Sequence, residues 1–229
     1  MDRLLIEDLK IWKDKSDRKP LILRGARQVG KTWLLKDFGE KCFKDICYVN
    51  FEQKDMLGKI FEGTLSPQRI IEQLSVFHGK KIQPQETLLI FDEVQELPRA
   101  LTSLKYFAEE APEYAICCAG SLLGVALHEG TSFPVGKVDF LDLYPLSFRE
   151  FLMANDEQML VDYIMSGNRD LKVFEEKLID YLKKYFIIGG MPAAILKWLD
   201  THDFFEVDDV QKQILSAYTN DFSKHAPRQ

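Results

Sequence analysis

The sequence has 229 residues and a formal net charge of −6, from 30 Lys and Arg against 36 Asp and Glu. Hydrophobic residues make up 46% and charged residues 29%, which is the composition of an ordinary folded protein and excludes a disordered chain. The acidic balance does not support dedicated nucleic-acid binding. No run of 18 apolar residues occurs, so the sequence predicts no membrane span.

The N-terminal segment predicts a helix. Leu5, Leu9 and Trp12 recur at helical spacing within residues 1–15. Charges stand among the first eight residues, where a signal peptide needs an apolar stretch, so we expect a cytoplasmic protein. The cysteines lack metal-ligand spacing and are expected to be reduced core residues: Cys42, Cys47, Cys117 and Cys118.

A phosphate-binding loop of the Walker A pattern, Gly25–Thr32, lies between an apolar run at 20–23 and a helical segment at 33–38. Its glycines let backbone N–H groups close around phosphates, Lys31 reaches their outer oxygens, and the Thr32 hydroxyl can bind Mg²⁺. The next helix adds roughly half a positive charge at its N-terminus. The sequence therefore predicts a nucleoside triphosphate and Mg²⁺ as ligands. The nucleotide-binding candidates are Gly25, Ala26, Arg27, Gln28, Val29, Gly30, Lys31, Thr32 and Trp33.

Two further elements follow the loop. The β-rich run at 46–51 predicts a strand. Ser66 and Pro67 then predict the start of a helix that ends near Gly79.

The apolar run at 87–91 reads as a buried strand that ends in Asp92 and Glu93, a Walker B pattern. Such a strand presents its terminal acid to magnesium, usually through water, so Asp92 joins Thr32 as a metal-binding candidate. Glu93 is placed to orient or deprotonate the attacking water and is the candidate catalytic base. The competing interpretation is a solvated acidic pair that opens the next loop.

Pro98 precedes a helical stripe, and the run at 114–120 predicts a further buried strand. Ser121 follows that strand, where phosphate-loop ATPases with an additional strand place a residue that senses the γ-phosphate. Ser121 is therefore a catalytic candidate together with Lys31 and Glu93. An equally weighted interpretation is that Ser121 caps a helix at 122–127, and the two roles can coexist.

The partly polar run at 137–143 predicts a strand at the sheet margin. Ser147 and Glu150 then form a capping-box pattern, with Leu146 and Phe151 placed as a hydrophobic staple. A helix therefore begins at this point.

The remainder of the chain has helical periodicity. One apolar stripe consists of Leu171, Phe174, Leu178, Tyr181 and Tyr185, and a second consists of Val207, Val210, Ile214 and Ala217. Gly189-Gly190-Met191-Pro192 interrupts the pattern. One interpretation of this run is a simple helix end.

The alternation of strands and helices predicts an α/β fold: a parallel-sheet P-loop NTPase core of the additional-strand type with a C-terminal helical lid region. We assign residues 1–147 to the core and its leading helix, and residues 148–229 to the lid or a small second domain. Arg99 and Arg149 are available to neutralise charge in the transition state, and one sequence does not select between them.

Five segments together resemble a prokaryotic family of AAA-type ATPases of the AAA+ superfamily: residues 23–32, 91–95, 119–124, 145–151 and 189–192. Members of this family carry the ATPase domain followed by a C-terminal domain of poorly known function.

That resemblance implies that Gly25–Thr32 binds phosphates, that Asp92 and Glu93 serve magnesium and water, and that Ser121 is the polar position ending the fourth strand. It also implies that the element at 189–192 brings the helical lid against the nucleotide. No arginine matches a second-sensor motif. We expect the chain to stop where the further C-terminal domain would begin.

The leading hypothesis is a Mg²⁺-dependent ATPase that converts ATP to ADP and phosphate and couples nucleotide state to an unidentified protein partner or to the missing domain. The alternative is a nucleotide-binding switch or scaffold with negligible turnover. An oligomer fits either hypothesis, nucleic acid is unsupported, and no membrane is expected. A GTPase is disfavoured because the chain lacks an Asn-Lys-x-Asp run.

Overall fold

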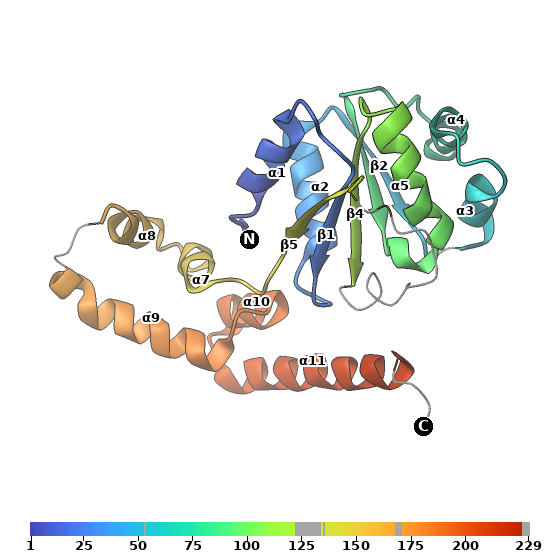
Figure 1. The fold of residues 1–229 in the computed structure, drawn as a ribbon. Helices are drawn as coiled ribbons and strands as arrows, with labels where there is room; N and C mark the ends of the chain where they lie inside the picture. The colour runs from blue at the N-terminus through green and yellow to red at the C-terminus, as the bar shows by residue number, and fades with distance from the viewer. Residues whose placement is uncertain (53, 122–133, 135, 168–170, 226–229) are drawn as a thin grey trace. The chain divides into compact units, whose positions relative to one another are not determined.

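The computed structural model describes residues 1–52, 54–121, 134, 136–167 and 171–225. The chain divides into two compact units (Figure 1). We call Leu5–Ala26 with Gly30–Leu143 the sheet unit. The helical unit consists of Met1–Leu4, Arg27–Val29 and Tyr144–Gln229.

The sheet unit is built on five parallel strands in the order β2-β3-β4-β1-β5. The strands are β1 (Leu21–Gly25), β2 (Asp45–Asn50), β3 (Thr87–Asp92), β4 (Ala115–Ser121) and β5 (Asp139–Asp142). The predicted parallel α/β fold is therefore confirmed. The additional strand is β4, which lies between β1 and β3, and β5 forms the predicted sheet margin beside β1.

Helices cover both faces of this sheet. They are α1 (Ile6–Asp14), α2 (Lys31–Cys42), α3 (Lys54–Phe61), α4 (Pro67–His78) and α5 (Pro98–Glu110), with a 3-10 turn η1 at Val94–Glu96. Helices α3, α4 and α5 pack over one face of the sheet. Helix α2 packs on the other face, and α1 packs against α2 (Figure 1). The result is a three-layer α/β unit.

Side chains alternate between the two faces along each strand. Cys47 and Leu89 belong to the core cluster under α3, α4 and α5. Their neighbours Ile46 and Leu88 lie against α2 at Gly39. Three of the cysteines are buried as predicted, but Cys42 is only half-buried, because it is the last residue of α2.

The helical unit contains α7 (Phe148–Ala154), α8 (Gln158–Met165), a 3-10 turn η2 (Leu171–Phe174), α9 (Glu175–Ile188), α10 (Pro192–Thr201) and α11 (Phe204–His225). The predicted capping box at α7 is present, because the Ser147 hydroxyl accepts from the Glu150 N–H and the Glu150 carboxylate accepts from the Ser147 N–H. The staple residues Leu146 and Phe151 are both buried in the core of this unit.

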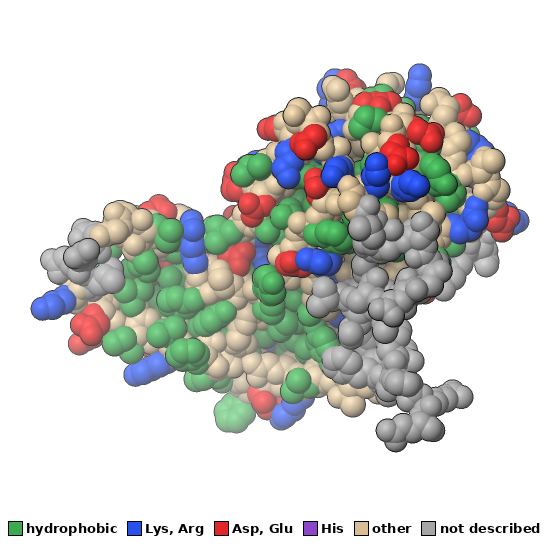
Figure 2. Space-filling model, in the orientation of Figure 1, with side chains coloured by type: hydrophobic (Ala, Val, Ile, Leu, Met, Phe, Trp, Pro, Cys, Tyr) green, Lys and Arg blue, Asp and Glu red, His purple; other side chains and the backbone are tan. Residues whose placement is uncertain are grey.

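The stripe predicted from 171 to 185 is divided in the structure, because residues 171–174 form the tighter 3-10 turn before α9. Helix α9 also leaves apolar side chains exposed, and Figure 2 shows hydrophobic side chains gathered over this part of the molecule. Those on α9 are Ile179, Leu182, Phe186 and Ile187. Within the described part of the chain, no helix combines the length and apolar character that crossing a bilayer requires.

Gly190 stands where two segments of the helical unit meet. Its carbonyl accepts a 2.7 Å hydrogen bond from the Leu146 N–H. A Cβ at this position would lie 2.3 Å from the Leu146 carbonyl oxygen and 3.0 Å from Pro145. The glycine therefore does more than end α9, since only a residue without a side chain permits this close approach.

We expect Gly190→Ala to lower the free energy of unfolding by about 2 kcal/mol, through overlap and loss of the hydrogen bond. Urea unfolding followed by circular dichroism measures the change. The control is Gly58→Ala in α3, where an added Cβ meets nothing within 4 Å. We expect that variant to be as stable as the wild type or more stable by about 0.5–1 kcal/mol. Equal stability of the Gly190→Ala protein and the wild type would contradict the close approach.

Candidate nucleotide-binding site

The phosphate-binding loop has the local structure that its sequence predicts. Strand β1 ends at Gly25 and helix α2 begins at Lys31. Gly30 precedes the helix with φ +93°, a left-handed conformation that favours glycine. Its carbonyl accepts the 2.9 Å hydrogen bond from Leu34 that opens the helix. The N–H groups at this helix end are therefore directed out of the first turn, where anions bind.

The other predicted loop residues differ in accessibility. Ala26, Arg27 and Gln28 are exposed, whereas Val29 is fully buried. Trp33, in the first turn of α2, is 45% exposed.

Lys31 is buried, with 8% of the residue exposed. Its ammonium donates hydrogen bonds of 3.0 Å to the Gly25 carbonyl and 2.9 Å to the Ala26 carbonyl. A buried ammonium must be hydrogen-bonded to offset the loss of water. The ammonium group is thus held against the backbone of the loop, where a phosphate oxygen bound by the loop would contact it.

Asp92, at the end of β3, is the acceptor at the centre of the site. The Thr32 hydroxyl donates to Asp92 Oδ2 at 2.9 Å, and the Tyr48 hydroxyl donates to the same oxygen at 2.8 Å. The Glu93 N–H donates to Oδ1 at 3.1 Å. Hydroxyl and carboxylate oxygens are the ligands that Mg²⁺ takes, so the predicted pair of Thr32 and Asp92 forms a suitable donor set.

Tyr48 was not singled out from the sequence. Its strand position places the hydroxyl beside Asp92, because Tyr48 lies on β2 and β2 pairs with β3. Burial raises the pKa of the Tyr48 phenol, and the hydrogen bond to Asp92 raises it further, so the hydroxyl stays a donor. The only sequence signal was a polar aromatic residue between the apolar residues Cys47 and Val49.

Glu93 has an unusual backbone. Its φ of +50° and ψ of 45° are left-handed, which costs free energy in a residue with a side chain and is often found at functional sites. The side-chain amide of the buried Gln95 donates to the Glu93 carboxylate. Gln95, a second residue that sequence reasoning did not identify, therefore sets the direction of the Glu93 side chain.

The remaining candidates from the sequence are Ser121, Arg99 and Arg149. Ser121 ends β4 opposite Gly25 in register, but its side chain and the helix expected at 122–127 lie outside the described residues. Arg99 donates to the carbonyl oxygens of Phe61 and Gly63, and Arg149 is exposed on α7.

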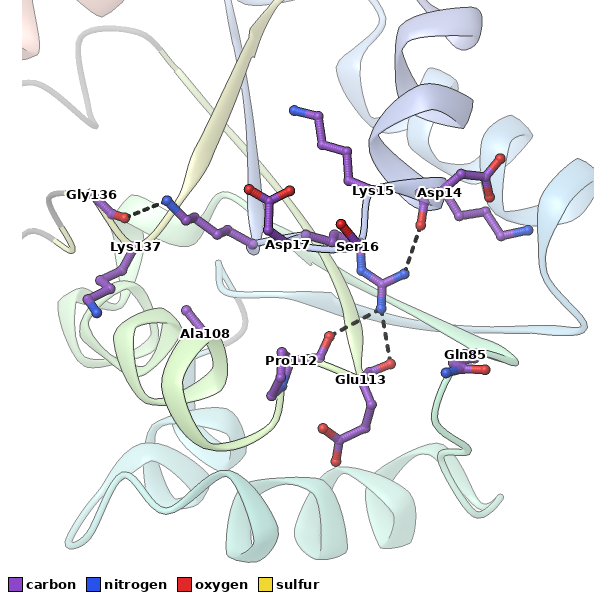
Figure 3. A pocket seen from close by; sticks show the side chains of 13 residues that line it. Asp14, Lys15, Ser16, Asp17, Gln85, Ala108, Pro112, Glu113, Gly136 and Lys137 are labelled. Carbon is purple, nitrogen blue, oxygen red and sulfur yellow. Dashed lines mark hydrogen bonds between the residues drawn. The ribbon is translucent and has the colours of Figure 1, made fainter.

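A cavity of about 780 Å³ lies at the other edge of the sheet (Figure 3). Gln85, Glu113 and Lys137 line it, and they lie on the segments that lead into β3, β4 and β5. The Arg18 guanidinium spans part of it, donating to the carbonyl oxygens of Pro112 at 3.3 Å and Glu113 at 3.0 Å. These are the amino ends of the strands, whereas the phosphate-binding loop follows the carboxyl end of β1. This cavity is therefore separate from the candidate nucleotide site.

The strand order, the strand–loop–helix and the acid at the end of β3 define a P-loop nucleoside triphosphatase fold. Residues 17–152, more than half of the chain, match the family model of an AAA domain, and the chain belongs to that family. A second model, a domain of unknown function, matches residues 179–229. That match falls within the region predicted to be the lid.

Two solved structures are similar over most of this chain, both at 15% sequence identity. Drosophila ORC bound to DNA matches over 95% of this chain and 66% of its own, with a TM-score of 0.47. C. elegans PCH-2 matches over 92% and 66%, with a TM-score of 0.48. A variant of Thermotoga maritima RuvB, at 16% identity, matches over 66% of this chain and 49% of its own, with a TM-score of 0.42. This chain thus spans about two thirds or less of each solved chain. No curated protein matches the sequence significantly.

We expect Tyr48→Phe to lower the free energy of unfolding by about 1–2 kcal/mol, because it removes a donor from a buried carboxylate. Urea denaturation at neutral pH measures this change. Tyr114→Phe is the control, since Tyr114 packs against the core of the same unit and the loss of one hydroxyl is identical. The same small effect in both variants would mean that the bond to Asp92 contributes nothing particular.

Proposed function

We propose that this chain binds ATP together with Mg²⁺ and hydrolyses it to ADP and phosphate. The observation that supports the proposal most directly is the 2.9 Å hydrogen bond between the Thr32 hydroxyl and the Asp92 carboxylate. This bond joins the end of the phosphate-binding loop, which follows β1, to the acid at the end of β3. Strands β1 and β3 are not neighbours in the sheet. Membership in a family of AAA domains supports nucleotide binding.

In this proposal the backbone of residues 25–30 and the ammonium of Lys31 bind the phosphate oxygens, and Trp33 lies beside them in the first turn of α2. Thr32 and Asp92 hold the magnesium, which when bound neutralises charge on the phosphates. Lys31 leaves the carbonyls of Gly25 and Ala26 for phosphate, so one set of hydrogen bonds replaces another.

Glu93 acts as the general base in this proposal. A carboxylate can orient a water molecule and accept its proton through a single hydrogen bond. Ser121, at the end of the strand beside β3, senses the γ-phosphate. Both assignments depend on their position at the carboxyl edge of the sheet, where parallel α/β folds bind ligands.

The proposed domain boundary lies at 147/148, four residues after the 143/144 division between the two compact units, with residues 148–229 serving as a lid. Its motion would couple nucleotide state to a protein partner or to a further C-terminal domain. The exposed apolar side chains on α9, including Phe186 and Ile187, support a role in contacting such a partner.

One observation favours the alternative of a switch with negligible turnover. Gln95 donates to the Glu93 carboxylate, and Glu93 holds a left-handed backbone conformation. A carboxylate engaged in this way is less available to activate water than an unengaged one. Binding without hydrolysis would then work by changing the surface that the protein presents.

We expect Lys31→Ala to raise the dissociation constant for ATP at least tenfold, about 1.4 kcal/mol, because the phosphates lose their nearest cation. Isothermal titration calorimetry with Mg²⁺ measures the constant. The control is Lys41→Ala on the same helix, whose ammonium pairs with Asp37 at the surface. Unchanged affinity in the Lys31→Ala protein would exclude this loop as the phosphate site.

We expect Glu93→Gln to retain ATP binding and to reduce turnover by about 10²–10⁴-fold, the range typical for loss of a general base. Phosphate release under saturating ATP measures turnover, and calorimetry verifies binding. Glu96→Gln, three residues further along the same turn, is the matched control.

The comparison between the two hypotheses uses the same assay. Turnover in the wild type that disappears in Glu93→Gln supports the ATPase with Glu93 as its base. Normal hydrolysis by Glu93→Gln excludes that assignment. Binding without turnover in the wild type supports the switch.

A further inference from the structure

Arg3 is a buried arginine near the N-terminus whose side chain is 5% exposed. Its guanidinium donates to the Val29 carbonyl at 2.8 Å, the Tyr144 carbonyl at 2.5 Å and Glu150 Oε1 at 3.0 Å. One planar cation thus joins a residue of the phosphate-binding loop to the start of α7, all within the helical unit. Nothing in the nucleotide chemistry proposed above uses Arg3.

Glu150 is held as firmly as Arg3, with 7% of its side chain exposed. Its Oε1 accepts from Arg3 and from the Leu4 N–H at 3.0 Å, and its Oε2 accepts from the Ser147 N–H at 2.8 Å. Burial alone would raise the pKa of Glu150, but the hydrogen bonds from Ser147, Leu4 and Arg3 outweigh it and lower the pKa. The carboxylate is therefore charged, and it fixes the guanidinium in one orientation.

The orientation of the Val29 carbonyl has a direct consequence for the loop. In a trans peptide the C=O of one residue and the N–H of the next point in opposite directions. Fixing the Val29 carbonyl on Arg3 therefore fixes the direction of the Gly30 N–H. Glycine imposes little conformational preference of its own, so the contact with Arg3 restricts a peptide that Gly30 itself does not.

A second contact acts on the same stretch of the loop. The Tyr218 hydroxyl of α11 donates to the Arg27 carbonyl at 2.6 Å. Residues 27–29 accordingly group with the helical unit, although the strand before them and the helix after them belong to the sheet unit.

We propose that Arg3 is a positioning residue of the phosphate-binding loop, which orients the Gly30 amide through the Val29 carbonyl, and that Glu150 acts through Arg3. This inference rests on the proposed function in taking nucleotide as the ligand of the loop. Nucleotide affinity then depends on a contact that also fixes the first turn of α7. Lysine cannot replace arginine here, because it lacks the planar fork that reaches three acceptors in fixed directions.

A purely structural role is the competing explanation, since removing one partner of a buried ion pair destabilises a protein wherever it lies. Arg18 provides the matched control. Like Arg3, it donates to three acceptors, but all of them are backbone carbonyls, those of Lys13, Pro112 and Glu113, at the amino edge of the sheet (Figure 3). Loss of stability is expected in both Arg3→Met and Arg18→Met.

The experiment compares the full chain with Arg3→Met, Arg3→Lys and Arg18→Met. The first readout is hydrogen exchange of the amides of residues 27–32 without nucleotide, followed by mass spectrometry. The second is the dissociation constant for Mg²⁺ and ATP by calorimetry. We expect faster exchange at these amides and an affinity at least tenfold weaker in both Arg3 variants, with affinity within twofold of wild type in Arg18→Met.

A double variant separates positioning from simple stabilisation. Glu150→Gln alone should weaken ATP binding about threefold to tenfold, since Arg3 loses its charged anchor. If Glu150 acts through Arg3, adding Glu150→Gln to Arg3→Met causes no further loss of affinity.

Wild-type affinity and wild-type exchange in a folded Arg3→Met protein would overturn the inference. If Arg3→Met does not fold, Arg3→Lys keeps a cation beside Glu150 and supplies the same two readouts. If the wild type itself binds no ATP, the proposed function fails, and the exchange comparison without nucleotide still decides whether Arg3 orders the loop.

Discussion

Parallel pairing of the five strands is the constraint on which the rest of this structure depends. Because β1, β3 and β4 run in one direction, their carboxyl ends share one edge, and Gly25 and Ser121 lie opposite each other in register. Parallel strands also require long crossovers, which here supply α2 to one face and α3, α4 and α5 to the other. The same constraint thus builds the core and brings the loop within reach of Asp92.

Local chemistry explains which features could be predicted from the sequence. The phosphate-binding loop, the acid ending β3 and the capping box at Ser147 each depend on residues within a few positions of one another. Tyr48 and Gln95 were out of reach, since the first requires knowing that β2 pairs with β3 and the second requires the left-handed backbone of Glu93. Arg3 and Glu150 are 147 positions apart in the sequence, so no short sequence pattern predicts their contact.

The helices show the same limit. Helix α3 was not predicted, because it spans only eight residues and contains Gly58, a poor helix former. The sequence identified Gly190 as part of a helix end, which is a local property. The approach of the Leu146 carbonyl, which forbids a side chain there, comes from a segment 44 positions earlier and follows only from packing of the helical unit.

Several polar groups of the candidate site are hydrogen-bonded to one another. Lys31 is bonded to the loop carbonyls, Thr32 and Tyr48 to Asp92, and Gln95 to Glu93. Nucleotide binding as proposed would exchange these hydrogen bonds for others. Such an exchange contributes far less to the free energy of binding than a hydrogen bond that replaces no other. The net free energy of binding must therefore come from groups that are already directed at the phosphates before the ligand arrives. Backbone amides meet that requirement only if the loop is held in one conformation. For this reason a contact such as Arg3 on Val29, although it touches no ligand, can control affinity as strongly as a residue that does.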